Sequence, residues 1–229
     1  MSTHTHSTAL APAPASASER DPAPRDPREV IDPLAWLLHP MSPEQFFSQF
    51  YEREPLVLQR EPGAPDYYAK LLTLDGVDRA VTALGLSNQE VNLVSAAREI
   101  TASDWSFPDG SIDAARVFEL HRQGATIVLQ QLHVTEPALA HLCRGLERVF
   151  SARFQVNVYV TPPSAQGFKT HFDSHDVFVL QAHGSKRWTL YDTPVELPPR
   201  GQPFEPGAYT PGNVSREFVL RAGDLAYVP

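Results

Sequence analysis

The second half of the chain has the residue pattern of consecutive short β-strands, and this pattern limits the fold more than any other feature. From Phe154 to Val160 apolar and polar residues alternate, which is the period of a strand with one buried face. Further strands are expected over residues 171–182, 186–191, 216–221 and 225–228, with His183-Gly184-Ser185 as a hairpin turn. Strands that follow one another through short turns favour an antiparallel sandwich or barrel such as a jelly roll.

The first half predicts mainly helices. Ser42-Pro43-Glu44-Gln45 has the pattern of a helix start, with serine as N-cap, proline at the first helical position and glutamine placed to close a capping box. Further helices are expected over residues 75–84 with Asp75 as the cap, 112–123 and 137–150, and short strands over 55–58, 91–95 and 125–130. The sequence therefore predicts an α+β fold that is mostly helical over 30–150 and built of jelly-roll strands over 151–229.

Composition narrows the class of protein. The 229 residues carry a formal net charge of −8, which argues against sequence-independent nucleic-acid binding. No apolar run is long enough for a transmembrane helix, so no membrane partner is expected. The single cysteine, Cys143, lies in a helical pattern among apolar neighbours and is expected to be a buried thiol. A metal site in this chain would have to be built from its 9 histidines and its carboxylates.

The first 29 residues have a different composition from the rest. They contain five prolines among alanine, serine and threonine, and no aromatic residue. Such a segment cannot bury enough apolar surface to offset its ordering entropy, so residues 1–29 are predicted to be a disordered tail before a single domain over 30–229. The segment lacks the basic start and continuous apolar stretch of a signal peptide, and a cytoplasmic protein is expected.

The densest group of polar residues lies in the segment from Lys169 to Asp176. If this segment is a strand, His171 and Asp173 share one face. A histidine and a carboxylate side by side are two of the three ligands in the facial site of non-haem Fe(II) oxygenases. A His-x-Asp tripeptide also arises readily by chance, so two structural polar residues are the alternative. The run Ser174-His175-Asp176 is not a hydrolytic triad, because adjacent residues on a strand point to opposite faces.

Three further residues are candidates for lining a cavity. Lys186 follows the hairpin turn and is expected to project towards the same cavity as His171, where a lysine needs an anionic partner. Asn157 and Tyr159 share the polar face of the preceding strand. The alternatives are a lysine with its ammonium in water and an ordinary solvated sheet face.

Residues 157–181, together with 184–191, resemble a known family. The stretches NVYVTPPSAQGFKTHFDSHDVFVLQ and GSKRWTLY are similar to the JmjC-type cupins of the ribosomal oxygenase group, which are Fe(II)- and 2-oxoglutarate-dependent protein hydroxylases. Leu37-Leu38-His39-Pro40 and Glu54-Pro55-Leu56 fit the family's entry segment, so the resemblance covers roughly residues 34–229. It implies that the strands form a double-stranded β-helix, the jelly roll of cupins.

The resemblance also assigns roles to residues. His171 and Asp173 match the first two iron ligands, and Lys186 matches the basic residue that pairs with the far carboxylate of 2-oxoglutarate. Asn157 and Tyr159 match residues that line the 2-oxoglutarate pocket. The family's third ligand is a histidine a few residues beyond the position of Pro229, and no residue of this sequence matches it. The sequence is therefore expected to be a fragment whose jelly roll is incomplete at its C-terminal end, with homodimer formation expected of a longer form.

The function implied by the resemblance is hydroxylation of a protein side chain, with a ribosomal protein as one expected substrate and Fe(II) and 2-oxoglutarate as cofactor and co-substrate. Lysine demethylation uses the same core chemistry and stays open. Two non-enzymatic alternatives also remain. One is a cupin-like binding module that lacks the third iron ligand, and the other is a metal-independent jelly roll in which His171 and Asp173 are structural.

Overall fold

The computed structural model describes residues 32–60, 64–192, 195–199, 201–202 and 204–229. The tail predicted over residues 1–29 lies outside these described residues. Helices and antiparallel strands are mixed as expected. In the part of the chain that the structure describes, each helix is too short or too polar to cross a lipid bilayer.

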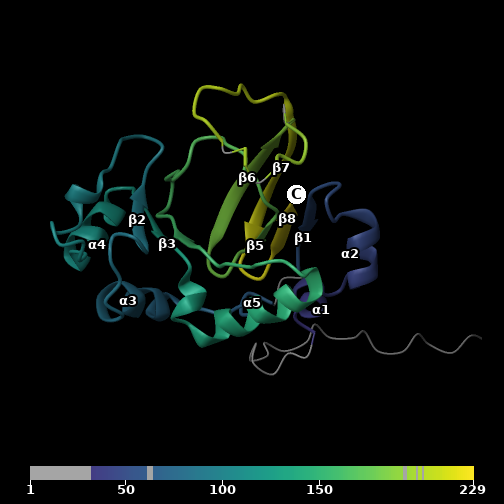
Figure 1. The fold of residues 1–229 in the computed structure, drawn as a ribbon, viewed down its shortest axis with the longest axis horizontal. Coiled ribbons are helices and arrows are strands. Elements are labelled where there is room, and N and C mark those ends of the chain that lie inside the picture. The colour runs from purple at the N-terminus through teal and green to yellow at the C-terminus, as the bar shows by residue number, and fades with distance from the viewer. Residues whose placement is uncertain (1–31, 61–63, 193–194, 200, 203) are drawn as a thin grey trace, which may run out of the picture.

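The strands form three antiparallel sheets. One sheet has the order β1-β8-β5, the second β2-β3-β4, and the third is the pair β6-β7. Their bounds are β1 Leu56–Leu58, β2 Val91–Val94, β3 Thr126–Leu129, β4 Val158–Val160, β5 Val177–Leu180, β6 Ser185–Tyr191, β7 Val214–Arg221 and β8 Leu225–Val228. The strands lie in the middle of the molecule, with the helices around their outside (Figure 1).

The helices match the sequence patterns closely, except that the helix Pro33–Leu38 was not predicted and the cap of a second helix differs. Their bounds are α1 Pro33–Leu38, α2 Pro43–Gln49, α3 Leu74–Ala83, α4 Ala114–Arg122 and α5 Pro137–Phe150, with short 3-10 turns η2 Ala102–Asp104 and η3 Leu132–Val134. The capping box of α2 is confirmed: Ser42 Oγ accepts from the Gln45 N–H, and the Gln45 side chain accepts from the Ser42 N–H. The cap of α3 was predicted wrongly. It is Thr73, whose hydroxyl accepts from the Gly76 N–H, and Asp75 lies in the first turn.

A cluster of aromatic rings joins the helical part to the strands. Phe46 of α2 has no exposed surface and packs edge-on against Tyr227 of β8, with 4.9 Å between ring centroids. It also contacts Phe178 of β5 at 5.6 Å and Phe150 at the end of α5 at 6.4 Å. One side chain therefore links α2, α5 and the β1-β8-β5 sheet, so the two halves of the sequence share one core.

A second link is made by buried polar groups next to the β7–β8 turn. Asp224 is 3% exposed, and its carboxylate accepts from the backbone N–H of Arg60 at 2.9 Å and of Arg221 at 2.7 Å. The Arg60 guanidinium in turn donates to the carbonyls of Gly223 and Leu37 and to the Tyr68 hydroxyl. These bonds hold the segment after β1 against the turn that leads into β8.

Candidate metal and anion site

His171 and Asp173 lie in the loop between β4 and β5, and the strand predicted over 171–182 is wrong at its start. Strand β5 begins only at Val177, which pairs with Val228 of β8. The next residue along the partner is Pro229, which has no N–H to extend the ladder. The local sequence has the alternation of a strand, but within the described part of the chain residues 171–176 pair with no strand.

The loop nevertheless brings the two side chains together. His171 Nε2 lies 3.9 Å from Asp173 Oδ1, and both side chains are partly open to solvent. His171 Nδ1 is 2.8 Å from the Lys169 carbonyl oxygen, which can only accept, so Nδ1 carries the hydrogen. In neutral His171 this bond leaves the Nε2 lone pair free on the side of the carboxylate.

This arrangement fits a metal ion. Two neighbouring ligands that each lie about 2.1 Å from a first-row metal are about 3 Å apart. His171 Nε2 and Asp173 Oδ1 lie 3.9 Å apart on two solvent-accessible side chains, so a small rotation of the side chains would bring both atoms onto one ion. The imidazole and carboxylate are the donor set of a non-haem Fe(II) site. Within the described residues, no group of three or more histidine, cysteine, aspartate or glutamate side chains is arranged to hold a metal. His171 and Asp173 are the candidates for two ligands of such a site.

Lys186 is on β6, and the predicted hairpin between its strand and the strand after His171 is wrong. Strand β5 pairs with β8, and β6 pairs with β7, with Lys186 opposite Leu220. The turn over 181–184, with Gly184 at φ 64°, carries the chain from one sheet to the other instead of folding it back within one sheet. Residue spacing alone does not distinguish these two connections.

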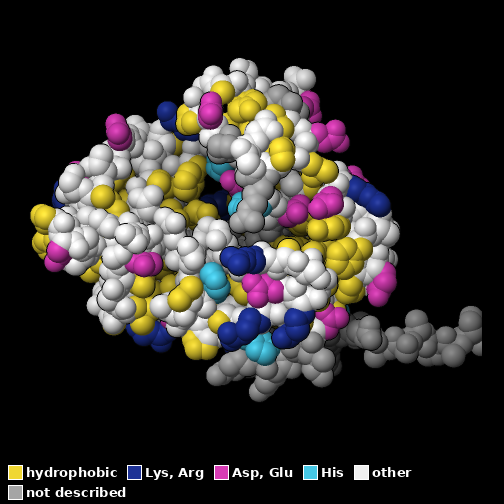
Figure 2. Space-filling model, viewed as in Figure 1, with side chains coloured by type: hydrophobic (Ala, Val, Ile, Leu, Met, Phe, Trp, Pro, Cys, Tyr) yellow, Lys and Arg dark blue, Asp and Glu magenta, His cyan; other side chains and the backbone are white. Residues whose placement is uncertain are grey.

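The environment of Lys186 suits an anion. Burial lowers the pKa of its ammonium group from the ordinary value of 10.5, because removal from water disfavours the charged form. Among the described residues, Lys186 has no carboxylate partner and no hydrogen bond. The face of the molecule seen in Figure 2 has a hollow near its middle, with histidine, acidic and basic side chains around it. A partly buried cation without a counter-ion can accommodate a carboxylate from outside the chain.

Tyr159 lies near the candidate metal site, whereas Asn157 holds a turn. Burial raises the pKa of the Tyr159 hydroxyl and the Asp173 charge raises it further, while a hydrogen bond from Asn157 acts in the opposite direction. Tyr159 stacks edge-on with Phe168, which contacts the His171 ring with centroids 5.6 Å apart. The Asn157 side-chain oxygen accepts from the Gln131 N–H at 3.0 Å, where Gln131 has a left-handed φ of 51°.

The loop that carries His171 is anchored on the β2-β3-β4 sheet. A Cβ at Gly167 would lie 2.7 Å from Thr126 Oγ1, so only glycine allows this approach to β3. The Gln166 carbonyl accepts from the Ala96 N–H at 2.9 Å, and Thr126 Oγ1 donates to Thr161 Oγ1 at 3.0 Å. Sequence reasoning missed these anchors, because nothing local in a Gln-Gly-Phe stretch identifies its contact with β3.

The far end of the loop is held by a bond that sequence reasoning also missed. The Tyr227 hydroxyl donates to Asp176 Oδ1 at 2.7 Å and accepts from the Glu52 N–H at 3.0 Å. Burial raises the pKa of this hydroxyl, and the Asp176 carboxylate raises it further. The bond fixes the residue just before β5 against the centre of β8.

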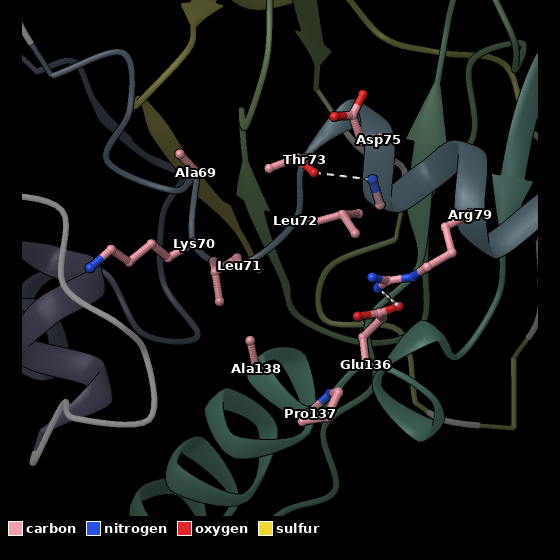
Figure 3. A pocket seen from close by; sticks show the side chains of 11 residues that line it. Ala69, Lys70, Leu71, Leu72, Thr73, Asp75, Arg79, Glu136, Pro137 and Ala138 are labelled. Atoms are coloured by element: carbon pink, nitrogen blue, oxygen red, sulfur yellow. Dashed lines mark hydrogen bonds and ion pairs between the residues drawn. The ribbon is translucent and has the colours of Figure 1, made fainter. Parts of the chain in front are cut away.

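Two other features do not belong to the site. A groove of about 460 Å³ runs between residues 69–79 and the start of α5 (Figure 3), where Arg79 and Glu136 pair at 2.7 Å and so neutralise each other. Cys143 is buried in α5 as expected, and burial raises the pKa of its thiol to about 11. A thiol with a raised pKa is a poor nucleophile, which agrees with a packing role.

Comparison with known proteins places the His171 loop and β6 within one recognised domain. Residues 128–229 match the family described as JmjC domain. The chain carries a JmjC domain. The candidate residues Asn157, Tyr159, His171, Asp173 and Lys186 all lie inside the matched range.

Curated relatives match more of the chain than the JmjC domain alone, and their matches include the helical part that precedes it. The chain is 31% identical over 202 residues to the bifunctional lysine-specific demethylase and histidyl-hydroxylase NO66 of Drosophila willistoni, covering 86% of this chain and 25% of that protein. It is 31% identical over 204 residues to ribosomal oxygenase 1 of Gallus gallus, covering 88% of this chain and 33% of that protein. The chain thus spans about a quarter to a third of the length of these relatives.

The fold of the JmjC domain is also found in a solved structure. The Escherichia coli ribosomal oxygenase YcfD superposes with a TM-score of 0.56 at 19% identity, over 82% of this chain and 46% of that one. At this identity the likeness concerns the fold, and it includes the helices that precede the JmjC domain. The resemblance of the sequence to JmjC-type ribosomal oxygenases is confirmed.

Proposed function

We propose that the protein is an Fe(II)- and 2-oxoglutarate-dependent oxygenase that hydroxylates a protein side chain. The observation that carries this proposal is the pair of His171 Nε2 and Asp173 Oδ1, 3.9 Å apart in a JmjC domain, with the imidazole oriented by the Lys169 carbonyl. Two relatives are named as a histidyl-hydroxylase and a ribosomal oxygenase, which supports a protein substrate and makes a ribosomal protein a reasonable one.

Each residue has a defined task in this proposal. His171 and Asp173 hold the metal, and the Lys186 ammonium pairs with the carboxylate of 2-oxoglutarate that is far from the metal. Tyr159 of β4 and the neighbouring ring of Phe168 line the side of the co-substrate cavity next to His171. When bound, Fe(II) and 2-oxoglutarate supply the oxygen activation, in which 2-oxoglutarate, O₂ and a substrate C–H give succinate, CO₂ and a C–OH group.

The fold supports the same assignment. We propose that the β1-β8-β5 sheet and the β6-β7 pair are facing walls of a double-stranded β-helix, with the metal loop at its open end. The crossing from β5 to β6 between two sheets is the kind of connection that a jelly roll has and a simple hairpin lacks. Demethylation of a lysine side chain remains compatible with the same residues, since one relative is named for both activities.

A non-catalytic binding module is the second candidate. It is favoured by one observation: within the described residues only two side chains are placed as metal ligands. This candidate predicts a protein that binds 2-oxoglutarate or a peptide but releases no succinate.

Succinate release separates the two candidates. With Fe(II), 2-oxoglutarate and O₂, the purified protein is expected to release succinate, and His171→Ala is expected to lower the rate roughly 100-fold because loss of a ligand removes the metal. His175→Ala is the matched control, since His175 is an exposed histidine of the same loop and is expected to retain the rate. No succinate from the unchanged protein, or equal rates from the two variants, contradicts the proposal.

A further inference from the structure

The face of β6 that carries Lys186 also carries a buried hydrogen-bond donor without an acceptor. The indole Nε1 of Trp188 is buried and has no hydrogen-bond partner among the described residues. Lys186 and Trp188 are two residues apart on one strand, so their side chains lie on the same face. Two donors without acceptors thus lie side by side.

The neighbours on this face cannot satisfy the two donors. Across the β6-β7 pair, Lys186 is opposite Leu220 and Trp188 is opposite Phe218, and neither side chain has an acceptor. A buried donor that lacks a partner costs about 1–3 kcal/mol, so an unmatched indole N–H beside a partly buried ammonium is costly. Such a pair of donors needs acceptors from outside the chain, which ordered water or a ligand can supply.

A carboxylate has the right form for this pair. It offers two oxygens in one plane, and each accepts hydrogen bonds. The ammonium of Lys186 sits on a flexible stem and follows the ligand, whereas the Trp188 N–H has a direction fixed by the packed ring. A fixed donor beside a mobile charge selects a planar carboxylate over a small spherical anion.

We propose that Trp188 is a binding residue of the same anion pocket: its Nε1–H donates to one oxygen of the distal carboxylate of a dicarboxylate co-substrate while Lys186 pairs with the other. This inference rests on the proposed function, because the co-substrate is 2-oxoglutarate. It adds to that function a second residue that binds the co-substrate. It also explains why the buried Trp188 N–H has no acceptor within the described residues.

The resonances of the three tryptophan indoles test the contact in the unchanged protein. With diamagnetic Zn(II) in place of Fe(II), addition of 2-oxoglutarate is expected to shift one indole N–H resonance in a ¹⁵N-labelled sample. That resonance is the one that disappears in Trp188→Phe, a variant that keeps an aromatic ring but removes the N–H donor together with part of the indole. Trp105→Phe is the control, because Trp105 Nε1 is also buried without a partner but lies outside the JmjC domain.

Calorimetry of 2-oxoglutarate binding then separates this inference from the proposed function. Trp188→Phe is expected to weaken binding about tenfold and Lys186→Met by at least as much, since hydrogen bonds to charged groups are the stronger kind. Trp105→Phe is expected to bind like the unchanged protein.

The contrary outcomes are distinct. If Lys186→Met loses affinity while Trp188→Phe does not, or if the Trp188 resonance stays in place when 2-oxoglutarate is bound, the role of Trp188 is overturned and the proposed function stands. If Lys186→Met also binds normally, or the unchanged protein does not bind 2-oxoglutarate, both are overturned.

Discussion

Replacing Phe46 by alanine is expected to lower the free energy of unfolding by about 4 kcal/mol, the cost of removing a large side chain from a packed core. Phe46 has no exposed surface and contacts rings of α5, β5 and β8. Because it joins α2 to the strands of the JmjC domain, its loss is expected to weaken the helical part and the strands together. Urea unfolding followed by circular dichroism and by tryptophan fluorescence measures this loss.

Phe107→Ala is the control for this prediction. Phe107 is 51% exposed, so its removal is expected to cost less than about 1 kcal/mol. The two probes are expected to give one coincident transition for both variants. Separate transitions in Phe46→Ala, with the strands retaining their stability, would show that the helical part and the JmjC domain are independent units.

Replacing Asp224 by asparagine is expected to cost about 3 kcal/mol of stability, because a hydrogen bond to a charged group is lost and a buried donor is left unpaired. The two oxygens of Asp224 accept from the N–H groups of Arg60 and Arg221. Asparagine keeps the shape of the side chain but replaces one oxygen by an NH₂ group, which cannot accept. Thermal and urea unfolding of the variant measure the cost.

Asp78→Asn provides the comparison for the loss of one negative charge. Asp78 is an exposed residue of α3, and its replacement is expected to change stability by less than about 0.5 kcal/mol. Equal stabilities of Asp224→Asn and Asp78→Asn would show that the carboxylate of Asp224 does not hold the segment after β1 to the β7–β8 turn.

Two helices could be predicted from short stretches of sequence, because capping residues and an apolar stripe determine them locally. The capping box at Ser42 gives helix α2, and the apolar stripe of residues 137–150 gives α5, with its bounds as predicted. Helix α1 was missed, because a six-residue helix with proline at its first position has too few turns to show a periodic pattern. Strand β8 has the predicted bounds.

The pairing of strands could not be predicted in the same way. The alternation of residues 171–182 is a real strand signal, but a strand forms only where a partner offers hydrogen bonds, and here that holds for Val177–Leu180 alone. The same limit explains the wrong hairpin between β5 and β6. Alternation shows which residues share a face and does not identify the strand that lies beside them.

In the candidate site, too, residues could be predicted from local sequence, whereas contacts between distant positions could not. His171, Asp173 and Lys186 were found from residue type and from a resemblance that extends over a long stretch. The anchors of their loop were not found, because Gly167 against Thr126 and Tyr227 against Asp176 join positions far apart in the sequence. The orphaned indole of Trp188 is also visible only when the neighbours on its face are known.

The most direct test of the central claim, that His171, Asp173 and Lys186 form one site, is calorimetry of 2-oxoglutarate binding with and without Mn(II). A shared site predicts that the metal tightens 2-oxoglutarate binding at least about tenfold, as a coupling free energy between two ligands. Asp173→Ala is expected to abolish this tightening, and Asp66→Ala, which removes an exposed carboxylate elsewhere, is expected to preserve it. Binding of 2-oxoglutarate that is equal with and without the metal, or tightening that survives in Asp173→Ala, would contradict the claim.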